Sequence, residues 1–390
     1  MCTAAQTKAD APKQENTMST PAQSANVTEI SMGALPFHLG IAFETKNPLF
    51  LHGPPGVGKS SGIYEFCEKK FEEGEFKSRK PIDIRLGNHD ITDFKFPLVD
   101  REHEVLKWIV ADIFPTEKRD GKSGILFLDE LSSAPQQIQT LAYAILQDRK
   151  IPSTNYELPS GWIVIAAGNR DGDQAVVHKL SSALCNRVNH LVIKPDWPSF
   201  KEWAETKGIH SHVMQFLEGR HSDYLYKYTR GEKAYPTPRT WEKASDSLKV
   251  LLSHKAPLFR IKEQMVSWLG AEAGTAITAY VDICAKLPNA KDLLEGKISL
   301  PKIDEIDKLF ILGQTLSETV QANPGKYAQA YLKLIMKDLN EEIAVDSLRR
   351  LLSNDTTKSK VVSAMQKEAK LFKQAVTKYG ATLSQLGLES

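Results

Sequence analysis

One short segment near the start of the chain could bind phosphate. It reads Leu51-His52-Gly53-Pro54-Pro55-Gly56-Val57-Gly58-Lys59-Ser60 and fits the pattern G-x-x-x-x-G-K-[ST] at every fixed position. Glycines let the backbone turn so that successive N–H groups point inward, and a helix that starts there adds the positive end of its dipole. The segment therefore predicts a site for a nucleoside triphosphate.

Side chains in this segment predict how the nucleotide is held. Lys59 would reach the β- and γ-phosphates, and the Ser60 hydroxyl would bind Mg²⁺. Residues 47–52 have the composition of a buried strand and residues 60–70 that of a helix, which argues against the alternative of a chance glycine-rich loop. We expect the phosphates to be surrounded by Gly53, Pro54, Pro55, Gly56, Val57, Gly58, Lys59, Ser60 and Ser61.

A pair of carboxylates follows a second apolar run, Gly124-Ile125-Leu126-Phe127-Leu128-Asp129-Glu130. Such a run predicts a buried strand that delivers both acids to one end of a sheet. Asp129 would hold Mg²⁺ through its water shell, and Glu130 would act as the general base for the attacking water. The pattern is common when it stands alone, and the phosphate-binding segment upstream is what gives it weight.

A third apolar run, from Trp162 to Ala167, ends in Gly168-Asn169-Arg170. The amide of Asn169 can both donate and accept, so it could hold the same water against the γ-phosphate. The alternative is an ordinary turn, because Gly-Asn pairs are common turn formers.

These motifs need a scaffold that brings strand ends together. Short apolar runs alternate with helical patterns from Ile30 to about Ile193, which predicts a parallel sheet with crossover helices. Ligands of such sheets bind at the carboxyl ends of the strands, where all three motifs fall. The predicted strands are Leu49–Leu51, Ile82–Leu86, Ile125–Leu128, Trp162–Ala167 and His190–Ile193.

Composition sets limits on the class of protein. The chain has 390 residues, of which 41% are hydrophobic and 25% charged, with a net charge of +2. This near-neutral balance does not favour a nucleic-acid partner. The 4 cysteines lie far apart without metal-ligand spacing, and no apolar run is long enough to cross a bilayer. We therefore expect reduced thiols and a soluble, cytoplasmic protein without a membrane segment.

The order of these motifs resembles the AAA+ ATPases, in which they are Walker A, Walker B and sensor 1. The resemblance covers roughly residues 35 to 290. Within that superfamily the chain is similar to the MoxR-type and dynein-related branch. Three features carry this finer likeness: the loop Leu86 to Asp100, the helix Ala134 to Gln147, and the Pro-Thr-Pro-Arg-Thr-Trp run from Pro236 to Trp241.

The resemblance implies roles for two arginines. Arg187, in Ser181-Ser182-Ala183-Leu184-Cys185-Asn186-Arg187, matches the arginine finger that enters a neighbouring subunit's site. Arg170 competes for that role, and Arg187 could instead be a surface residue that caps a helix. Arg239 matches sensor 2 at the start of the first lid helix, with a solvated loop arginine as the alternative. A finger supplied in trans implies a homo-oligomer, expected to be a hexameric ring.

The expected fold class is α/β. A P-loop NTPase parallel sheet with flanking helices precedes a small all-α lid and a helical C-terminal extension. The expected domains are a disordered tail (1–28), the AAA+ nucleotide-binding domain (29–198), the lid (199–298) and the extension (299–390). Helices are expected at Phe200–Lys207, Ser211–Glu218, Thr240–Ser253, Lys262–Lys286, Asp304–Glu318, Gly325–Leu339, Val345–Leu352 and Lys358–Tyr379.

Two segments of the first domain are candidates for contact with a client. The polar loop Leu86–Pro97 could face a central pore with Phe94 and Phe96, although their alternation also suits a half-buried strand. The turn-rich stretch Asp148–Gly161 resembles the presensor hairpin of the branch. Asp171, Asp173 and His178 match no metal template and are expected to be solvated.

The resemblance implies an ATP-hydrolysing, Mg²⁺-dependent ring that remodels or activates a protein client. Members of this branch often act with a partner that carries a von Willebrand factor A domain. A nucleic-acid motor or loader is the alternative, which the missing basic stripe disfavours. A nucleotide-bound structural module with little turnover is a third possibility, against which the acid at Glu130 argues.

Overall fold

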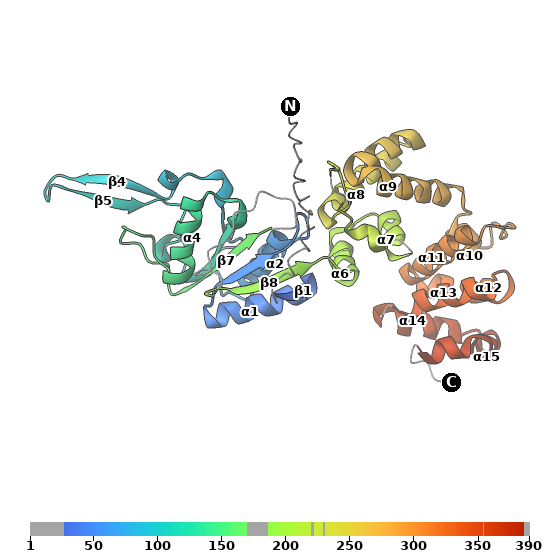
Figure 1. Cartoon of the computed structure of the whole chain (residues 1–390). Coiled ribbons are helices and arrows are strands. Elements are labelled where there is room, and N and C mark those ends of the chain that lie inside the picture. Colours follow the sequence, from blue (N-terminus) through green and yellow to red (C-terminus); the bar gives the residue numbers. More distant parts are fainter. Residues whose placement is uncertain (1–26, 170–185, 220–221, 229–230, 354, 386–390) are drawn as a thin grey trace, which may run out of the picture. The chain divides into compact units, whose positions relative to one another are not determined.

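The computed structural model describes residues 27–169, 186–219, 222–228, 231–353 and 355–385. The chain divides into two compact units (Figure 1). The first contains residues up to Pro54 together with Lys59–Lys194, and the second contains Pro55–Gly58 together with the residues from Pro195 onward. The three folded domains expected from the sequence, 29–198, 199–298 and 299–390, differ from this division into two units and remain a proposal.

A six-stranded parallel sheet forms the centre of the first unit, with strand order β1-β8-β2-β7-β6-β3. The parallel sheet predicted from the sequence is confirmed. Its strands are β1 (Thr28–Ser31), β2 (Leu49–His52), β3 (Ile82–Arg85), β6 (Ser123–Asp129), β7 (Gly161–Gly168) and β8 (Asn189–Lys194).

Strand β1 is not predicted by the sequence pattern, which places residues up to 28 in a disordered tail. It pairs with β8 at the edge of the sheet, with Thr28 opposite Leu191. Only Ile30 of its four residues is buried. One buried side chain among polar neighbours is too weak a pattern to predict an edge strand from sequence.

Helices and strands of the first unit share apolar cores on both faces of the sheet. Leu126 and Leu128 of β6 pack in one cluster with Ile138 and other apolar residues of α4. Because side chains alternate along a strand, Phe127 and Asp129 point to the opposite face. Among the described residues of this unit, the helices of four or more residues are α1 (Leu35–Thr45), α2 (Lys59–Glu72), α3 (Glu117–Asp120) and α4 (Gln136–Asp148).

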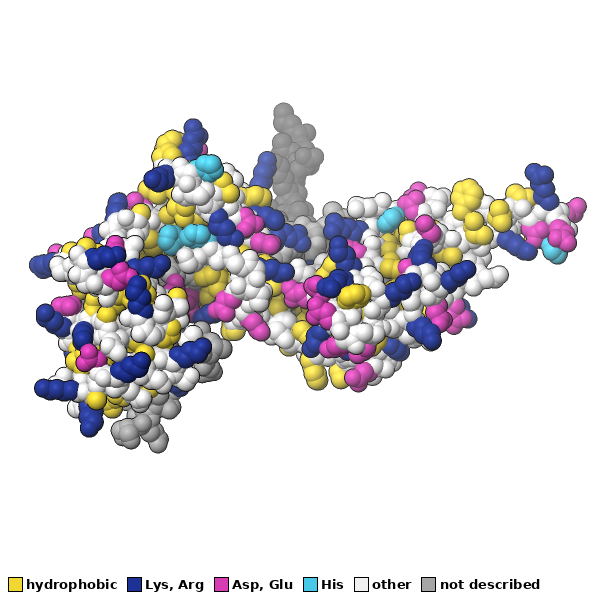
Figure 2. All heavy atoms as spheres, turned by 180° about the vertical axis from the view of Figure 1, so that it is seen from behind, with side chains coloured by type: hydrophobic (Ala, Val, Ile, Leu, Met, Phe, Trp, Pro, Cys, Tyr) yellow, Lys and Arg dark blue, Asp and Glu magenta, His cyan; other side chains and the backbone are white. Residues whose placement is uncertain are grey.

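An antiparallel hairpin of β4 (Lys95–Asp100) and β5 (Val105–Val110) extends from this unit (Figure 1). Its side chains are exposed, with Phe96 at 61% and Leu106 at 63%, and Figure 2 shows hydrophobic surface along it. Phe94, in contrast, is fully buried and packs on Phe114. The prediction that Phe94 faces a pore is therefore wrong, because the ring is buried in the cluster that β6, β7 and α4 share.

The stretch Asp148–Gly161 contains one antiparallel bridge, between Lys150 and Glu157. This bridge closes a short hairpin-like turn between α4 and β7. Between α4 and β7 the chain thus has the turn residues expected from the sequence, but it forms no strand of several residues.

The second unit is helical in the part that the structure describes. A capping box at Thr237 and a proline at Pro238 start its helix α8, and Gly270 interrupts α9 with a φ of 78°. The helices are α6 (Trp197–Lys207), α7 (Ser211–Glu218), α8 (Pro238–Ser253), α9 (Leu258–Lys286), α10 (Ala290–Leu294), α11 (Ile306–Ala322), α12 (Pro324–Lys337), α13 (Glu341–Leu352), α14 (Asp355–Gln366) and α15 (Ala369–Gln385).

Two hydrophobic clusters lie within this helical unit. One is built by residues between Phe200 and Val281, and the other by residues between Ala290 and Tyr379. The single helix predicted over Lys358–Tyr379 is wrong, since the chain turns between α14 and α15 to bring Val361 and Tyr379 into one cluster. Among the described helices, none has the length and apolarity needed to span a membrane.

Close packing between β6 and β7 yields a stability prediction. A Cβ at Gly124 would lie 2.7 Å from the Trp162 ring, which is 3% exposed and donates its Nε1–H to the Gly121 carbonyl. Gly124→Ala should lower the free energy of unfolding by about 1–3 kcal/mol, because the ring has no room to move. Urea unfolding measures this difference.

Gly40→Ala is the matched control, because a Cβ at Gly40 in α1 meets nothing within 4 Å. This helical substitution should raise stability by about 0.5–1 kcal/mol. Equal stabilities of the Gly124→Ala protein and the wild type would contradict the packing seen between the two strands.

Candidate functional site

The phosphate-binding segment has the strand–loop–helix order that its chemistry requires. β2 ends at His52, the loop follows, and α2 begins at Lys59. Gly56 and Gly58 have φ values of 79° and 103°, which L side chains rarely adopt. The glycines of the motif are thus placed where the turn needs them.

Lys59 points its ammonium group into this loop. Nζ donates to the carbonyl oxygens of Gly53 and Pro54, the latter at 3.1 Å. It also lies 3.5 Å from Oδ1 of Asn169, the first residue after β7. Since β7 pairs with β2, the sheet itself brings the lysine and the amide together.

Ser60 and Asp129 form the second pair of the site. The Ser60 hydroxyl donates to Oδ2 of Asp129 at 3.1 Å, and Oδ1 of Asp129 accepts from the Glu130 backbone N–H at 2.9 Å. Hydroxyl and carboxylate oxygens are the ligands that Mg²⁺ prefers in proteins. The residues present therefore fit a magnesium ion held against this serine and aspartate.

Glu130 occupies an unusual backbone conformation at the end of β6. Its φ of 60° and ψ of 29° lie in the left-handed region, which costs energy for a residue with a Cβ. The side chain is exposed, and its Oε2 lies against Gly87, where an added Cβ would be 3.1 Å away. A strained, exposed carboxylate beside the Ser60–Asp129 pair is suited to act on a substrate rather than to stabilise the fold.

Ser132 is a site residue that the sequence reasoning missed. It is 2% exposed, and its Oγ accepts the backbone N–H of Asn169 at 2.9 Å. Gly168 leaves room for this contact, since a Cβ there would lie 2.7 Å from the same Oγ. The short turn after Glu130 thereby holds the backbone at the end of β7, and with it the position from which the Asn169 side chain extends. Nothing in the residue pattern signals this link.

A further acid, Asp83, lies on β3, which pairs with the strand that carries Asp129. Tyr64 stands one helical turn after Ser60 on α2, and its hydroxyl donates to Oδ2 of Asp83 at 2.9 Å. Burial, together with the Asp129 charge, raises the pKa of Asp83, and burial raises the pKa of Tyr64 to about 12. Oδ1 of Asp83 is buried and finds no hydrogen-bond partner among the described residues. This excess of negative charge is what a bound divalent cation would offset.

The two arginines suggested by the resemblance lie in different units. In the first unit, Arg187 is exposed and its guanidinium donates to Oε1 of Gln147 near the end of α4. In the second unit, Arg239 lies exposed in the first turn of α8, and its backbone N–H donates to the Gly56 carbonyl at 3.2 Å. Arg170, Asp171, Asp173 and His178 lie outside the described residues.

The Ser132 contact leads to a second stability prediction. Ser132→Ala should cost about 1–3 kcal/mol, because the buried N–H of Asn169 loses its acceptor. Ser133→Ala is the control: its hydroxyl donates to the Glu130 carbonyl at 3.0 Å from a partly buried position, so its loss should cost less than about 1 kcal/mol. Thermal unfolding followed by circular dichroism compares the two, and the reverse ranking would contradict the assigned contact.

Comparisons with known proteins give no close relative. No protein-family model matches the chain, and no curated protein matches its sequence. Solved structures align weakly. NtrX from Brucella abortus gives a TM-score of 0.34 at 16% identity, over 58% of this chain and 52% of NtrX.

Two further structures align at similar levels. An ATPase candidate from Cytophaga hutchinsonii gives 0.30 at 13% identity over 82% of this chain and 89% of its own. An MCM homolog from Methanopyrus kandleri gives 0.28 at 13% identity over 64% and 55%. The chain thus spans about half the length of the NtrX and MCM chains. Because these scores are low, any assignment of activity and family rests on the chain's own residues.

Proposed function

We propose that this chain is an Mg²⁺-dependent ATPase of the AAA+ type. The observation that carries the proposal is the pairing of two side chains at the start of α2 with two at the ends of β6 and β7. Ser60 bonds Asp129 at 3.1 Å, and Lys59 lies 3.5 Å from Asn169. This set places a lysine ammonium group, a hydroxyl, a carboxylate and an amide around one phosphate-binding loop. Phosphoryl transfer to water requires groups of these kinds.

Each side chain has a distinct task in the proposed reaction. Lys59 would exchange its loop carbonyls for the β- and γ-phosphate oxygens, and Asn169 would orient the attacking water. Glu130 would accept the water proton as the new P–O bond forms and the bond to the bridging oxygen breaks, releasing ADP and phosphate. Bound at Ser60 and Asp129, Mg²⁺ would supply neutralising charge on the phosphate oxygens.

Assembly into a ring is the second part of the proposal. Arg187 is exposed in the first unit, so its guanidinium is accessible to a neighbouring subunit. A guanidinium placed there would neutralise charge in the transition state of the neighbour's site. Arg239 would contact the γ-phosphate as sensor 2 and report its loss to α8. A homo-oligomeric, hexameric ring satisfies both roles.

The client is proposed to be a protein, as in the MoxR-type branch, with a von Willebrand factor A domain partner. Support comes from the β4–β5 hairpin, whose exposed apolar side chains suit protein contact better than contact with a polyanion. On the face in Figure 2, basic and acidic side chains are interspersed. We propose a cytoplasmic location for the protein. ATP hydrolysis that is stimulated by DNA but by no protein would favour the alternative, a motor or loader that acts on nucleic acid.

Two substitutions separate binding from turnover. Lys59→Ala should weaken ATP binding by about 10- to 100-fold, because charged hydrogen bonds to phosphate are lost. Glu130→Gln keeps the side-chain volume, so it should bind ATP as the wild type does and hydrolyse it about 10²- to 10⁴-fold more slowly. Calorimetry and phosphate release measure the two effects. Unchanged hydrolysis in Glu130→Gln would remove the residue from its role as base.

The arginine finger can be tested by mixing subunits. Arg187→Ala alone should bind ATP normally and lose about 10³- to 10⁵-fold in hydrolysis rate. Mixed with Glu130→Gln subunits, it should regain activity, since one variant supplies the guanidinium and the other the base. A chain carrying both substitutions, mixed with Glu130→Gln, is the control and should stay inactive. If the first mixture is equally inactive, Arg187 does not act in trans, and the same test passes to Arg170.

A further inference from the structure

A cavity of about 670 Å³ opens within the helical second unit. Its walls come from α7, α9, α10 and α11, and from the link between α9 and α10. Small-molecule sites in proteins fall in this size range. The cavity belongs to neither the phosphate loop nor the strands that carry the proposed ATPase chemistry, so a ligand could bind in it whether or not the chain hydrolyses ATP.

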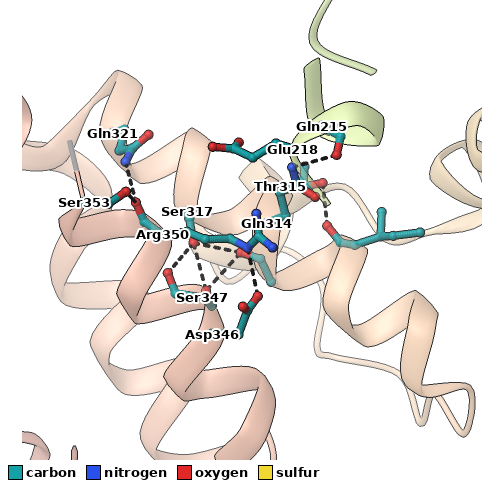
Figure 3. Close-up of polar contacts among 12 residues, drawn as sticks. Gln215, Glu218, Gln314, Thr315, Ser317, Gln321, Asp346, Ser347, Arg350 and Ser353 are labelled. Atoms are coloured by element: carbon teal, nitrogen blue, oxygen red, sulfur yellow. Dashed lines mark hydrogen bonds and ion pairs between the residues drawn. The ribbon is translucent and has the colours of Figure 1, made fainter. Parts of the chain in front are cut away.

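Glu318 of α11 lines this cavity, and Gln215 of α7 fixes its carboxylate. Nε2 of Gln215 donates to Oε2 of Glu318, while Oε1 of Gln215 accepts from the Tyr280 hydroxyl at 3.2 Å. The backbone carbonyl of Gln215 accepts from Nε2 of Gln314 at 3.2 Å (Figure 3). Because Tyr280 and Gln314 hold Gln215 in turn, the Glu318 carboxylate is positioned before any ligand arrives.

In the described part of the chain, no cation forms an ion pair with the Glu318 carboxylate. Burial raises the pKa of Glu318 to about 7, and Glu218 of α7 adds to the rise. Lys201 of α6 and Arg350 of α13 oppose it weakly, but their charges face Glu218 and Asp346, with which they form ion pairs. The site therefore favours whatever positive charge can reach it.

Two further titratable groups that line the cavity, His212 and Cys284, are neutral near pH 7. Burial lowers the pKa of His212 to about 4 and raises that of the Cys284 thiol to about 11. Nδ1 of His212 is buried without a hydrogen-bond partner among the described residues. Lys291 in α10 also lines the cavity and is exposed to water. The cavity thus offers one acid, the hydroxyls of Ser211, Thr315 and Thr319, and apolar side chains.

We propose that this cavity binds a small organic cation, with an ammonium or guanidinium group against Glu318 and an apolar portion against Leu287, Pro288 and Leu312. The fixed carboxylate supplies the charge that the cation meets. A cation replaces the proton that Glu318 otherwise holds near neutrality. Binding is therefore stronger above pH 7, where the carboxylate is ionised, and is lost as the pH falls below it.

The proposal can be tested with three probes of one shape: n-butylammonium, n-butylguanidinium and n-butanol. Methyl NMR on the full-length protein reports binding through the signals of Leu312, Ala285 and Ala322, which line the cavity. The two cations should shift these signals saturably, and the alcohol should shift them at least about tenfold more weakly, since it lacks the charged hydrogen bond.

Three variants localise the effect. Glu318→Gln should weaken binding of the cations by at least about tenfold. Thr315→Lys places an ammonium group one helical turn from Glu318 and should block the cavity from within. Glu342→Gln removes an exposed acid of α13 that does not line the cavity and should leave affinity unchanged. Equal shifts with the alcohol, full affinity in Glu318→Gln, or no shift with either cation would overturn the proposal.

Discussion

The pairing of β2, β7 and β6 in one parallel sheet is the constraint on which the rest of the site depends. These strands lie next to one another although long stretches of chain separate them. Each delivers one part of the equipment at its carboxyl end: the phosphate loop, Asn169, and Asp129 with Glu130. Hydrogen bonds between strands fix the spacing of these groups more firmly than loops could.

Two layers of polar contact attach α2 to this sheet. Ser60 bonds Asp129 in the upper layer, and Tyr64 bonds Asp83 in the lower one. The two carboxylates repel each other, which raises the pKa of Asp83 beyond what burial alone does. A divalent cation at Ser60 and Asp129 would relieve this repulsion. We therefore infer that the neighbouring Tyr64–Asp83 contact favours metal binding at Ser60 and Asp129.

Strong periodicity made much of the first unit predictable. Five of the six strands of the sheet and the loop between β2 and α2 follow from apolar runs and a motif with fixed positions. The edge strand β1 was not predictable, because only one of its side chains is buried. Phe94 also misled, because alternation with Phe96 cannot tell a buried ring from an exposed one. Ser132 and Asp83 gave no signal, since their roles depend on residues brought close only by the fold.

Apolar spacing in the sequence predicted helices of the second unit, but it did not predict the turn between α14 and α15. The cavity beside Glu318 was also hidden, because an acid at a helical position normally predicts a solvated face. Its burial results from the packing of α7 against α11, which no local pattern encodes. Sites that form between helices distant in the sequence are thus the part of the structure that a single sequence does not predict.

Anomalous scattering from Mn²⁺, used in place of Mg²⁺, tests the central claim most directly. Crystals would be grown with Mn²⁺ and a nonhydrolysable ATP analogue. Our account predicts a metal peak beside the hydroxyl of Ser60 and the carboxylate of Asp129, with the terminal phosphate between Lys59 and Asn169. Nucleotide bound elsewhere, or a metal peak remote from Ser60, would contradict it.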